Sequence, residues 1–488
     1  MIIMKFSITF ARKFSVLALV ACALPACAHL HADQPLLITI QEGHVLHTVP
    51  PRFHGTNFVA LWNPTGDTPA TERAFAQLGA KLVRFPGGVP CQWYDWKNPM
   101  ATGWTTITPQ TAWHLSKAGQ GAMVFQTNTA ANVSTIKGVK GHFDSSGAHM
   151  AEWVRQAKQQ GIPVAYWEIG NEPEMDAPEK LKSNQEEVYR WYNTIYTEQA
   201  TAIRRADPTA RIAGPAATNV WYWWTQHNLD KFLKAHGNKS GDGLADVISL
   251  HWYPNGGEGA WEKMRGAAQD WQGCWDYIQG AIRQYDSRPM PVIITEWNWG
   301  GGDKNTSNPQ LANALGNADC IGMFVRTGVS AHTHFCLQKI EKNWGVLASK
   351  QDSKPENAAS LTFYALSIAS RLGGEVLSLR SDSDEKNQLS AYATRKGSLV
   401  QVMLINKTPQ PQNVALRFDK IQTSGKAVKV YTMEGDKGRL NDTEARYNGV
   451  KSPLPSQGAL PAPKKITLGK GGTYMTAPYS LSLLEFAQ

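Results

Sequence analysis

The chain has 488 residues, of which 42% are hydrophobic and 18% are charged, a composition typical of a globular protein with room for one large and one smaller domain. Its formal net charge is +9. Three of the basic residues lie within the first 28 positions, where no acid offsets them, so the remainder carries 9 minus 3, or +6. The other Lys and Arg residues are scattered, which argues against nucleic acid as a partner.

Residues 1–28 have the pattern of an export signal. A basic stretch precedes the apolar run FSVLALVACALPA (14–26), and cleavage after Ala28 or Ala32 would release an exported protein. The sequence LVAC, which ends at Cys22, also looks like a bacterial lipoprotein box. The run is too short to span a bilayer, and no other run is long enough. We therefore expect a periplasmic or secreted protein with no membrane span, and a lipid anchor at Cys22 as the alternative.

Eight strand-like runs come next, separated by amphipathic helical patterns. The runs cover 53–61, 80–88, 122–128, 163–171, 210–216, 246–254, 291–299 and 328–335. The clearest helical patterns cover 150–161, 185–208 and 311–328, and each ends at Gly or Asp-Pro. Strands that alternate with helices in this way predict a (β/α)8 barrel over residues 50–375. The alternative is a doubly wound open sheet, but no G-x-G-x-x-G follows the first strand.

Beyond about residue 375 the pattern becomes all-β. Residues 389–408 read as two alternating strands around an Arg-Lys-Gly turn, and 427–433 and 479–486 are further strands. The early run LLITI (36–40) precedes the barrel and is expected to join them. The sequence thus predicts a C-terminal β-sandwich built from residues 34–49 and 376–488.

Four cysteines lie outside the signal: Cys91, Cys274, Cys320 and Cys336. In an oxidising compartment they permit up to two disulfides, and buried thiols that pack as small apolar groups are the alternative. Neither the cysteines nor the histidines have metal-site spacing, so we expect no metal and no cofactor.

Two glutamates end predicted strands of the barrel. Glu172 ends the fourth strand and Glu296 ends the seventh, and the carboxyl ends of barrel strands meet at one rim. Two facing carboxyl groups are what glycoside hydrolysis needs, because one must donate a proton to the leaving oxygen while the other, ionised, attacks the anomeric carbon. Trp167 and Trp297, which adjoin strand-end acids, are expected to provide apolar surroundings that raise the pKa of the proton donor.

The segments WEIGNEPEM (167–175) and ITEWNWGGG (294–302) resemble signatures of the large clan of retaining barrel glycosidases. LVRFPGGVPCQWYDWKN (82–98) and the C-terminal APYSLSLLEF are similar to segments of α-L-arabinofuranosidases. The resemblance implies that Glu172 is the acid/base and Glu296 the nucleophile. It also implies roles for four neighbours: Asn171 binds the sugar, Arg84 helps to keep Glu296 ionised, and His251 or Tyr253 orients the nucleophile.

The segment 294–302, together with LANALGNADCIGMFVRTGVSAHTH (311–334), also resembles barrel endoglucanases and xyloglucanases. The first function expected is therefore an α-L-arabinofuranosidase acting on plant-type polysaccharide, and the second an endo-β-glucanase or xyloglucanase. A catalytically silent carbohydrate-binding protein is the alternative from another class. The oligomeric state is left open, and the partner expected is an oligo- or polysaccharide.

Further polar and aromatic residues lie near the predicted strand ends. Glu168 is expected to be a buried, paired acid, and Glu174 a solvated loop residue. His332 and His334 fit either the pocket or the core. The further sugar ligands expected are Asn57 and Asn128, which end strands, with Trp297 and with Trp221 from the aromatic stretch 221–224.

Overall fold

The computed structural model describes residues 34–61, 68–99, 107–129, 144–218, 226–254, 261–300, 310–340, 344–422, 425 and 427–487. The predicted signal, with Cys22, lies outside these ranges, so export stays a prediction. Within them, no helix is both long enough and apolar enough to cross a bilayer.

The predicted (β/α)8 barrel is confirmed. Eight strands close into a parallel barrel in chain order, each paired with the next and the last paired with the first. They are β2 (His54–Asn57), β3 (Leu82–Phe85), β4 (Ala122–Thr127), β5 (Val164–Ile169), β6 (Ile212–Ala217), β7 (Val247–Trp252), β8 (Val292–Trp297) and β9 (Ala331–His334). Every one lies within a run expected from the sequence, apart from one residue at the end of β6.

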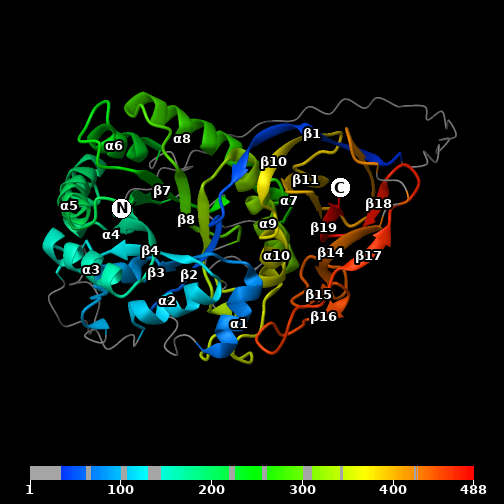
Figure 1. Ribbon diagram of the computed structural model, residues 1–488, viewed down its shortest axis with the longest axis horizontal. Coiled ribbons are helices and arrows are strands. Elements are labelled where there is room, and N and C mark those ends of the chain that lie inside the picture. Colours follow the sequence, from blue (N-terminus) through cyan, green and yellow to red (C-terminus); the bar gives the residue numbers. More distant parts are fainter. Residues whose placement is uncertain are drawn as a thin grey trace, which may run out of the picture. The chain divides into compact units, whose positions relative to one another are not determined.

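Helices surround the barrel strands (Figure 1). They are α1 (Pro69–Leu78), α2 (Pro109–Ala118), α3 (Gly147–Gln159), α4 (Pro173–Asp176), α5 (Gln185–Ala206), α6 (Gln226–His236), α7 (Trp261–Met264), α8 (Trp271–Tyr285), α9 (Leu311–Thr327) and α10 (Leu361–Ala369). Their starts follow ordinary capping chemistry. At the start of α1, the side chain of Thr68 accepts a hydrogen bond from the backbone N–H of Thr71, and at the start of α2, Thr108 accepts one from Thr111. A proline is the first residue of both helices, where no backbone donor is needed.

The all-β part is confirmed as a single sheet of eleven strands. They are β1 (Leu36–Val49), β10 (Gly374–Ser381), β11 (Leu389–Lys396), β12 (Leu399–Asn406), β13 (Gln412–Phe418), β14 (Ala427–Gly435), β15 (Ala445–Tyr447), β16 (Val450–Lys451), β17 (Lys464–Thr467), β18 (Thr473–Thr476) and β19 (Ser480–Ala487). As expected, the segment before the barrel joins it: β1 pairs antiparallel with β10 and parallel with β13.

This sheet folds over on itself and encloses its own apolar core. Five strand pairings separate β13 from β19 along the sheet, yet the rings of Phe418 and Phe486 lie 4.8 Å apart. Tyr474 of β18 likewise places its hydroxyl 2.9 Å from that of Ser482 in β19. Because strands distant in the sheet order face one another, the sheet encloses a core as the two layers of a sandwich do.

The barrel interior is layered. Leu82, Val124 and Tyr166 belong to one buried apolar cluster contributed by the barrel strands. Side chains two residues apart share a face of a strand, so the next layer toward the carboxyl ends holds the residues two positions on. This layer is largely polar and includes Arg84, Gln126 and Glu168, all of them buried. It forms the floor beneath the carboxyl ends of the strands.

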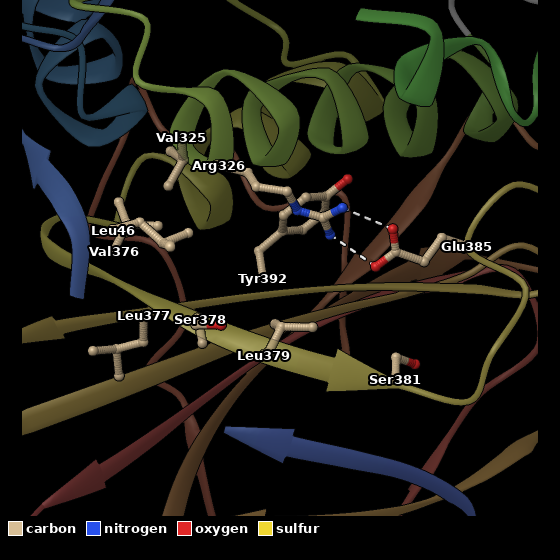
Figure 2. Close-up of a pocket in the computed structure, with 11 residues that line it drawn as sticks. Leu46, Val325, Arg326, Val376, Leu377, Ser378, Leu379, Ser381, Glu385 and Tyr392 are labelled. Carbon is tan, nitrogen blue, oxygen red and sulfur yellow. Dashed lines mark hydrogen bonds and ion pairs between the residues drawn. The ribbon is translucent and has the colours of Figure 1, made fainter. Parts of the chain in front are cut away.

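The barrel and the sheet pack through α9 and α10, which lie against β11, β12, β14 and β19 (Figure 1). A buried ion pair joins them, since Lys407 Nζ lies 2.6 Å from Asp319 Oδ2 of α9. Figure 2 shows a second link, in which Arg326 of α9 pairs with both carboxylate oxygens of Glu385 beside a cavity of about 290 Å³. The guanidinium of Arg326 also lies over the ring of Tyr392. The charged group of Arg326 is therefore already engaged by residues of the protein itself.

The four cysteines outside the signal are buried free thiols. The sequence left open either disulfides or small buried thiols, and the structure has the second.

Candidate active site

Glu172 and Glu296 meet at the carboxyl end of the barrel. Glu172 follows β5 and Glu296 lies near the end of β8. One carboxylate oxygen of each lies within 4.8 Å of the other, with a nitrogen of His251 equally near. Both glutamates line a cavity of about 580 Å³, a volume in the range of small-molecule sites.

Arg84 connects the site to the polar floor of the barrel. Its fully buried guanidinium donates to Glu168 Oε2 at 2.6 Å and to Glu296 Oε2 at 3.0 Å. It also donates to the side-chain oxygens of Asn57 and Asn171, each at 2.9 Å. One cation therefore faces two buried acids and fixes the orientation of two amides.

Glu296 accepts hydrogen bonds on both oxygens. Tyr253 donates its hydroxyl to Oε1 at 2.7 Å, and Arg84 donates to Oε2. The pKa of Glu296 is raised by burial, and the charge of Glu172 adds to this rise, while the charge of Arg84 and the hydrogen bond from Tyr253 oppose it. Hydrogen bonds to both oxygens favour the ionised form.

Glu172 has a different environment. Burial raises its pKa to about 7, and the charge of Arg84 opposes this rise. Its hydrogen-bond partner in the site is His251, whose Nδ1 lies 2.8 Å from Oε1. A carboxyl with a pKa of about 7 still holds its proton in half of the molecules at neutral pH.

The tautomer of His251 follows from its neighbours. Burial lowers the pKa of His251 to about 4, so the ring is neutral at neutral pH. Its Nε2 lies 3.2 Å from Arg84 Nη2, which can only donate, so Nε2 accepts and the proton is on Nδ1. His251 therefore donates to Glu172 Oε1, which leaves Oε2 as the oxygen that carries the acidic proton.

The backbone holds Glu172 and Gly88 in uncommon conformations. Glu172 has φ of 35°, in the left-handed region, and precedes the proline that opens α4. Strained backbone of this kind is concentrated at functional sites. Gly88 has φ of 78°, and a Cβ built on it would lie 3.4 Å from Glu296 Oε2 and 3.3 Å from the ring of Phe335. A glycine here keeps the space in front of Glu296 open.

The structure brings several of the predicted site residues together at the cavity and places others away from it. Asn171 lines the cavity beside Glu172, as expected of a sugar ligand. Of the two residues expected to orient the nucleophile, Tyr253 bonds Glu296, whereas the Nδ1 of His251 bonds Glu172 and lies 3.9 Å from Glu296. Trp221 lies outside the described residues.

The expected contacts of Trp297, Asn57 and Asn128 with sugar are corrected by the structure, because none of the three lines the cavity. The indole of Trp297 packs against Phe324 and donates to His332, so it also cannot provide an apolar surrounding for Glu172. Asn57 donates to backbone oxygens of β8 and β9 and accepts from Arg84. Asn128 is buried.

The predictions for Glu168 and Glu174, the two acids that flank Glu172, have opposite outcomes. Glu168 is a buried acid paired with Arg84, as expected. Glu174 was expected in solvent, and this is wrong. The short helix α4 turns its side chain inward, where Tyr189 and Asn228 donate to Oε1 and burial raises its pKa to about 7.

The histidines of β9 belong to the core. His332 is bonded to His54 and Trp297, and His334 is fully buried. Neither histidine lines the cavity.

Gln126 and Asp176 were missed. Gln126 accepts from the backbone of Gly87 and Gly88 and donates to Asn171. Asp176 accepts from the side-chain nitrogen of Asn171 at 3.2 Å. The alternation along 122–128 could have revealed Gln126, since it shares a layer with Arg84 and Glu168. The inward turn that buries Asp176 had no signal in the sequence.

Glu172, His251 and Glu296 could each offer one atom to a metal ion. The chemistry of the donor set does not favour one. His251 already uses both ring nitrogens for hydrogen bonds, and the guanidinium of Arg84 lies 3.0 Å from Glu296, where it would repel a second cation.

A parallel barrel with two carboxyl groups facing one another at its carboxyl rim defines the class of barrel glycoside hydrolases. Residues 156–336, which contain both glutamates, match the model of the family described as Glycosyl hydrolases family 39. This match and the fold support a glycoside hydrolase.

The chain is also similar to Endoglucanase A of Paenibacillus lautus, with 22% identity over 279 residues. That similarity covers 46% of this chain and 37% of the length of the relative.

Among solved structures, the fold is similar to the α-L-arabinofuranosidase from Thermotoga maritima, with a TM-score of 0.67, 13% identity, and 93% of this chain and 100% of that chain covered. It is also similar to a family 44 endoglucanase from Clostridium thermocellum, with a TM-score of 0.61, 17% identity, and 92% and 99% covered. The expected resemblance to both groups is thus confirmed for the fold.

Proposed function

We propose that the protein hydrolyses glycosidic bonds with net retention, by a double displacement that uses Glu172 and Glu296. The observation that carries this proposal is that the two carboxyl groups approach within 4.8 Å across one cavity with different hydrogen-bond partners. Retaining glycosidases hold their carboxyl groups about 5–5.5 Å apart, whereas inverting ones need about 6.5–9.5 Å to admit a water molecule.

In the first step, Glu296 attacks the anomeric carbon and forms a glycosyl ester. The bond from that carbon to the leaving oxygen breaks, and the proton on Glu172 Oε2 passes to this oxygen. In the second step, Glu172, now ionised, takes a proton from water, whose oxygen attacks the same carbon and releases Glu296. Arg84 and Tyr253 hold Glu296 in place throughout, and His251 holds Glu172.

The substrate proposed first is an α-L-arabinofuranosyl linkage in plant-type polysaccharide. The 82–98 segment, the C-terminal APYSLSLLEF and the similarity in fold to the Thermotoga maritima arabinofuranosidase support it. An endo-acting β-glucanase or xyloglucanase is the second candidate. The similarity to Endoglucanase A, and to a solved Paenibacillus polymyxa xyloglucanase of family 44, favours it.

The stereochemistry of hydrolysis tests the mechanism. We expect the first sugar released from an aryl glycoside to have the anomeric configuration of the substrate, as followed by proton NMR before mutarotation. Product inversion would contradict the proposal.

Digestion of arabinoxylan and xyloglucan separates the two substrates, since single sugars indicate the first and oligosaccharides the second. Binding without turnover of any sugar would indicate a silent carbohydrate-binding protein.

The pH dependence tests the role of Glu172. Because the pKa of Glu172 is about 7, the protonated acid is lost as pH rises through this value, and kcat/KM should fall above it. The fall should be marked for an aryl glycoside with a poorly acidic phenol, which needs the proton. For a dinitrophenyl glycoside, whose leaving group needs no proton, the fall should be absent. The same alkaline fall for both substrates would contradict the assignment.

A further inference from the structure

One wall of the active-site cavity is formed by the segment after β9. We call this segment, described at 335–340 and 344–352, the β9 loop. It contributes Phe335, Lys339, Trp344 and Gln351 to the cavity lining. The rings of Phe335 and Trp344 lie 5.3 Å apart at nearly a right angle. Aromatic rings of this kind offer apolar surface to the faces of sugars.

Backbone hydrogen bonds hold the β9 loop in place. Cys336 and Trp344 are joined at 2.9 Å, Leu337 and Leu347 at 2.8 Å, and Lys339 and Leu347 at 3.1 Å. Leu337 also donates to the backbone oxygen of Asn57 at the end of β2. Backbone hydrogen bonds within the β9 loop and between the loop and β2 therefore fix the backbone that carries the cavity-lining side chains.

Lys339 has an unusual backbone conformation. Its φ is 103°, in a region that residues with a Cβ rarely adopt. Its N–H and its carbonyl are both engaged, with Leu347 and Gly345. Strained residues persist where the surroundings fix them, and they are concentrated at ligand sites. The hydrogen bonds of the β9 loop therefore hold Lys339 in a strained backbone conformation that it would not adopt by itself.

The ammonium of Lys339 has a neutral partner. Its Nζ donates to the side-chain oxygen of Gln351 at 2.8 Å. An ammonium can only donate, so Gln351 must present its oxygen there, which leaves its amide nitrogen as a second donor on the same wall. Among the described residues the ammonium forms no ion pair, and it lies on the cavity wall, where a ligand can reach it.

We propose that Lys339 and Gln351 form a subsite for a sugar carboxylate, so that the preferred substrate carries a uronic acid residue near the bond that is cleaved. A carboxylate has two acceptor oxygens, and the ammonium and the amide nitrogen are two donors on one wall. The proposal rests on the proposed glycosidase function and names its substrate class.

The test compares glucuronoarabinoxylan fragments with the same fragments after reduction of the carboxyl group to a hydroxymethyl group. We expect wild-type kcat/KM to be about 10-fold higher on the acidic fragments, mainly through KM, and the preference to decline with added salt. In Lys339→Met the ratio should fall to about one, and Lys339→Arg should retain most of it. Lys350→Met is the matched control, because Lys350 is an exposed lysine of the same loop outside the cavity lining, and its ratio should equal wild type.

Equal rates of the wild type on the two fragments, or a preference that survives in Lys339→Met, would overturn the subsite. Binding of both fragments to Glu296→Gln is measured by calorimetry as well, and equal affinities there would overturn it independently of turnover. Failure of the proposed function has a different result, since the wild type would then hydrolyse neither fragment nor any aryl glycoside.

Discussion

Replacement of Glu296 by glutamine is expected to lower kcat on an aryl glycoside by about 10⁴- to 10⁶-fold, the range found when one member of a catalytic set is removed. An amide in this position has no free electron pair basic enough to form the glycosyl ester. It also loses the charge that Arg84 faces at 3.0 Å. The measurement is steady-state hydrolysis of a nitrophenyl glycoside, with any wild-type contamination excluded by a mechanism-based titrant.

The matched control is Glu179→Gln, which removes a glutamate whose side chain is 81% exposed and lies outside the cavity lining. This variant should retain wild-type activity. Thermal unfolding of Glu296→Gln verifies that loss of activity is not loss of fold. A variant that keeps more than about a tenth of wild-type kcat would remove Glu296 from the role of nucleophile.

The barrel was predictable because its pattern is strong. Each strand is a short apolar run that ends at a turn, and helices with one apolar face separate the strands. Once eight such units are counted, closure of the barrel brings the ends of the fourth and seventh strands together, although 124 residues separate Glu172 from Glu296 in the chain. The pairing of the two acids is thus a consequence of topology.

The details of the site were less predictable because they depend on side-chain direction at strand ends. Trp297 adjoins Glu296 in sequence, but adjacent residues of a strand face opposite ways, so it packs against Phe324. Glu174 looked like an exposed loop acid, and the single turn of α4 buries it. The β9 loop has no periodicity, so nothing in its sequence indicated that Lys339 and Trp344 line the cavity.

Replacement of Arg84 by methionine is expected to destabilise the protein as well as inactivate it. Arg84 and Glu168 are both fully buried, and Arg84 donates to Glu168 Oε2, while Oε1 has no hydrogen-bond partner among the described residues. Removal of one member of a buried ion pair costs about 3–5 kcal/mol in the free energy of unfolding, because the remaining charge has no compensation. Urea denaturation at neutral pH measures this loss.

The double variant Arg84→Met/Glu168→Gln separates the two roles of Arg84. It removes the uncompensated charge, so we expect it to recover part of the stability lost in Arg84→Met. Strongly non-additive effects are expected for residues in direct contact. Activity should not recover, because Glu296 and Asn171 still lack their hydrogen bonds from Arg84. If the stability losses simply added, the buried charge of Glu168 would not be what Arg84 compensates. If activity returned with stability, Arg84 would serve the fold alone, and the charge facing Glu296 would be dispensable for the reaction.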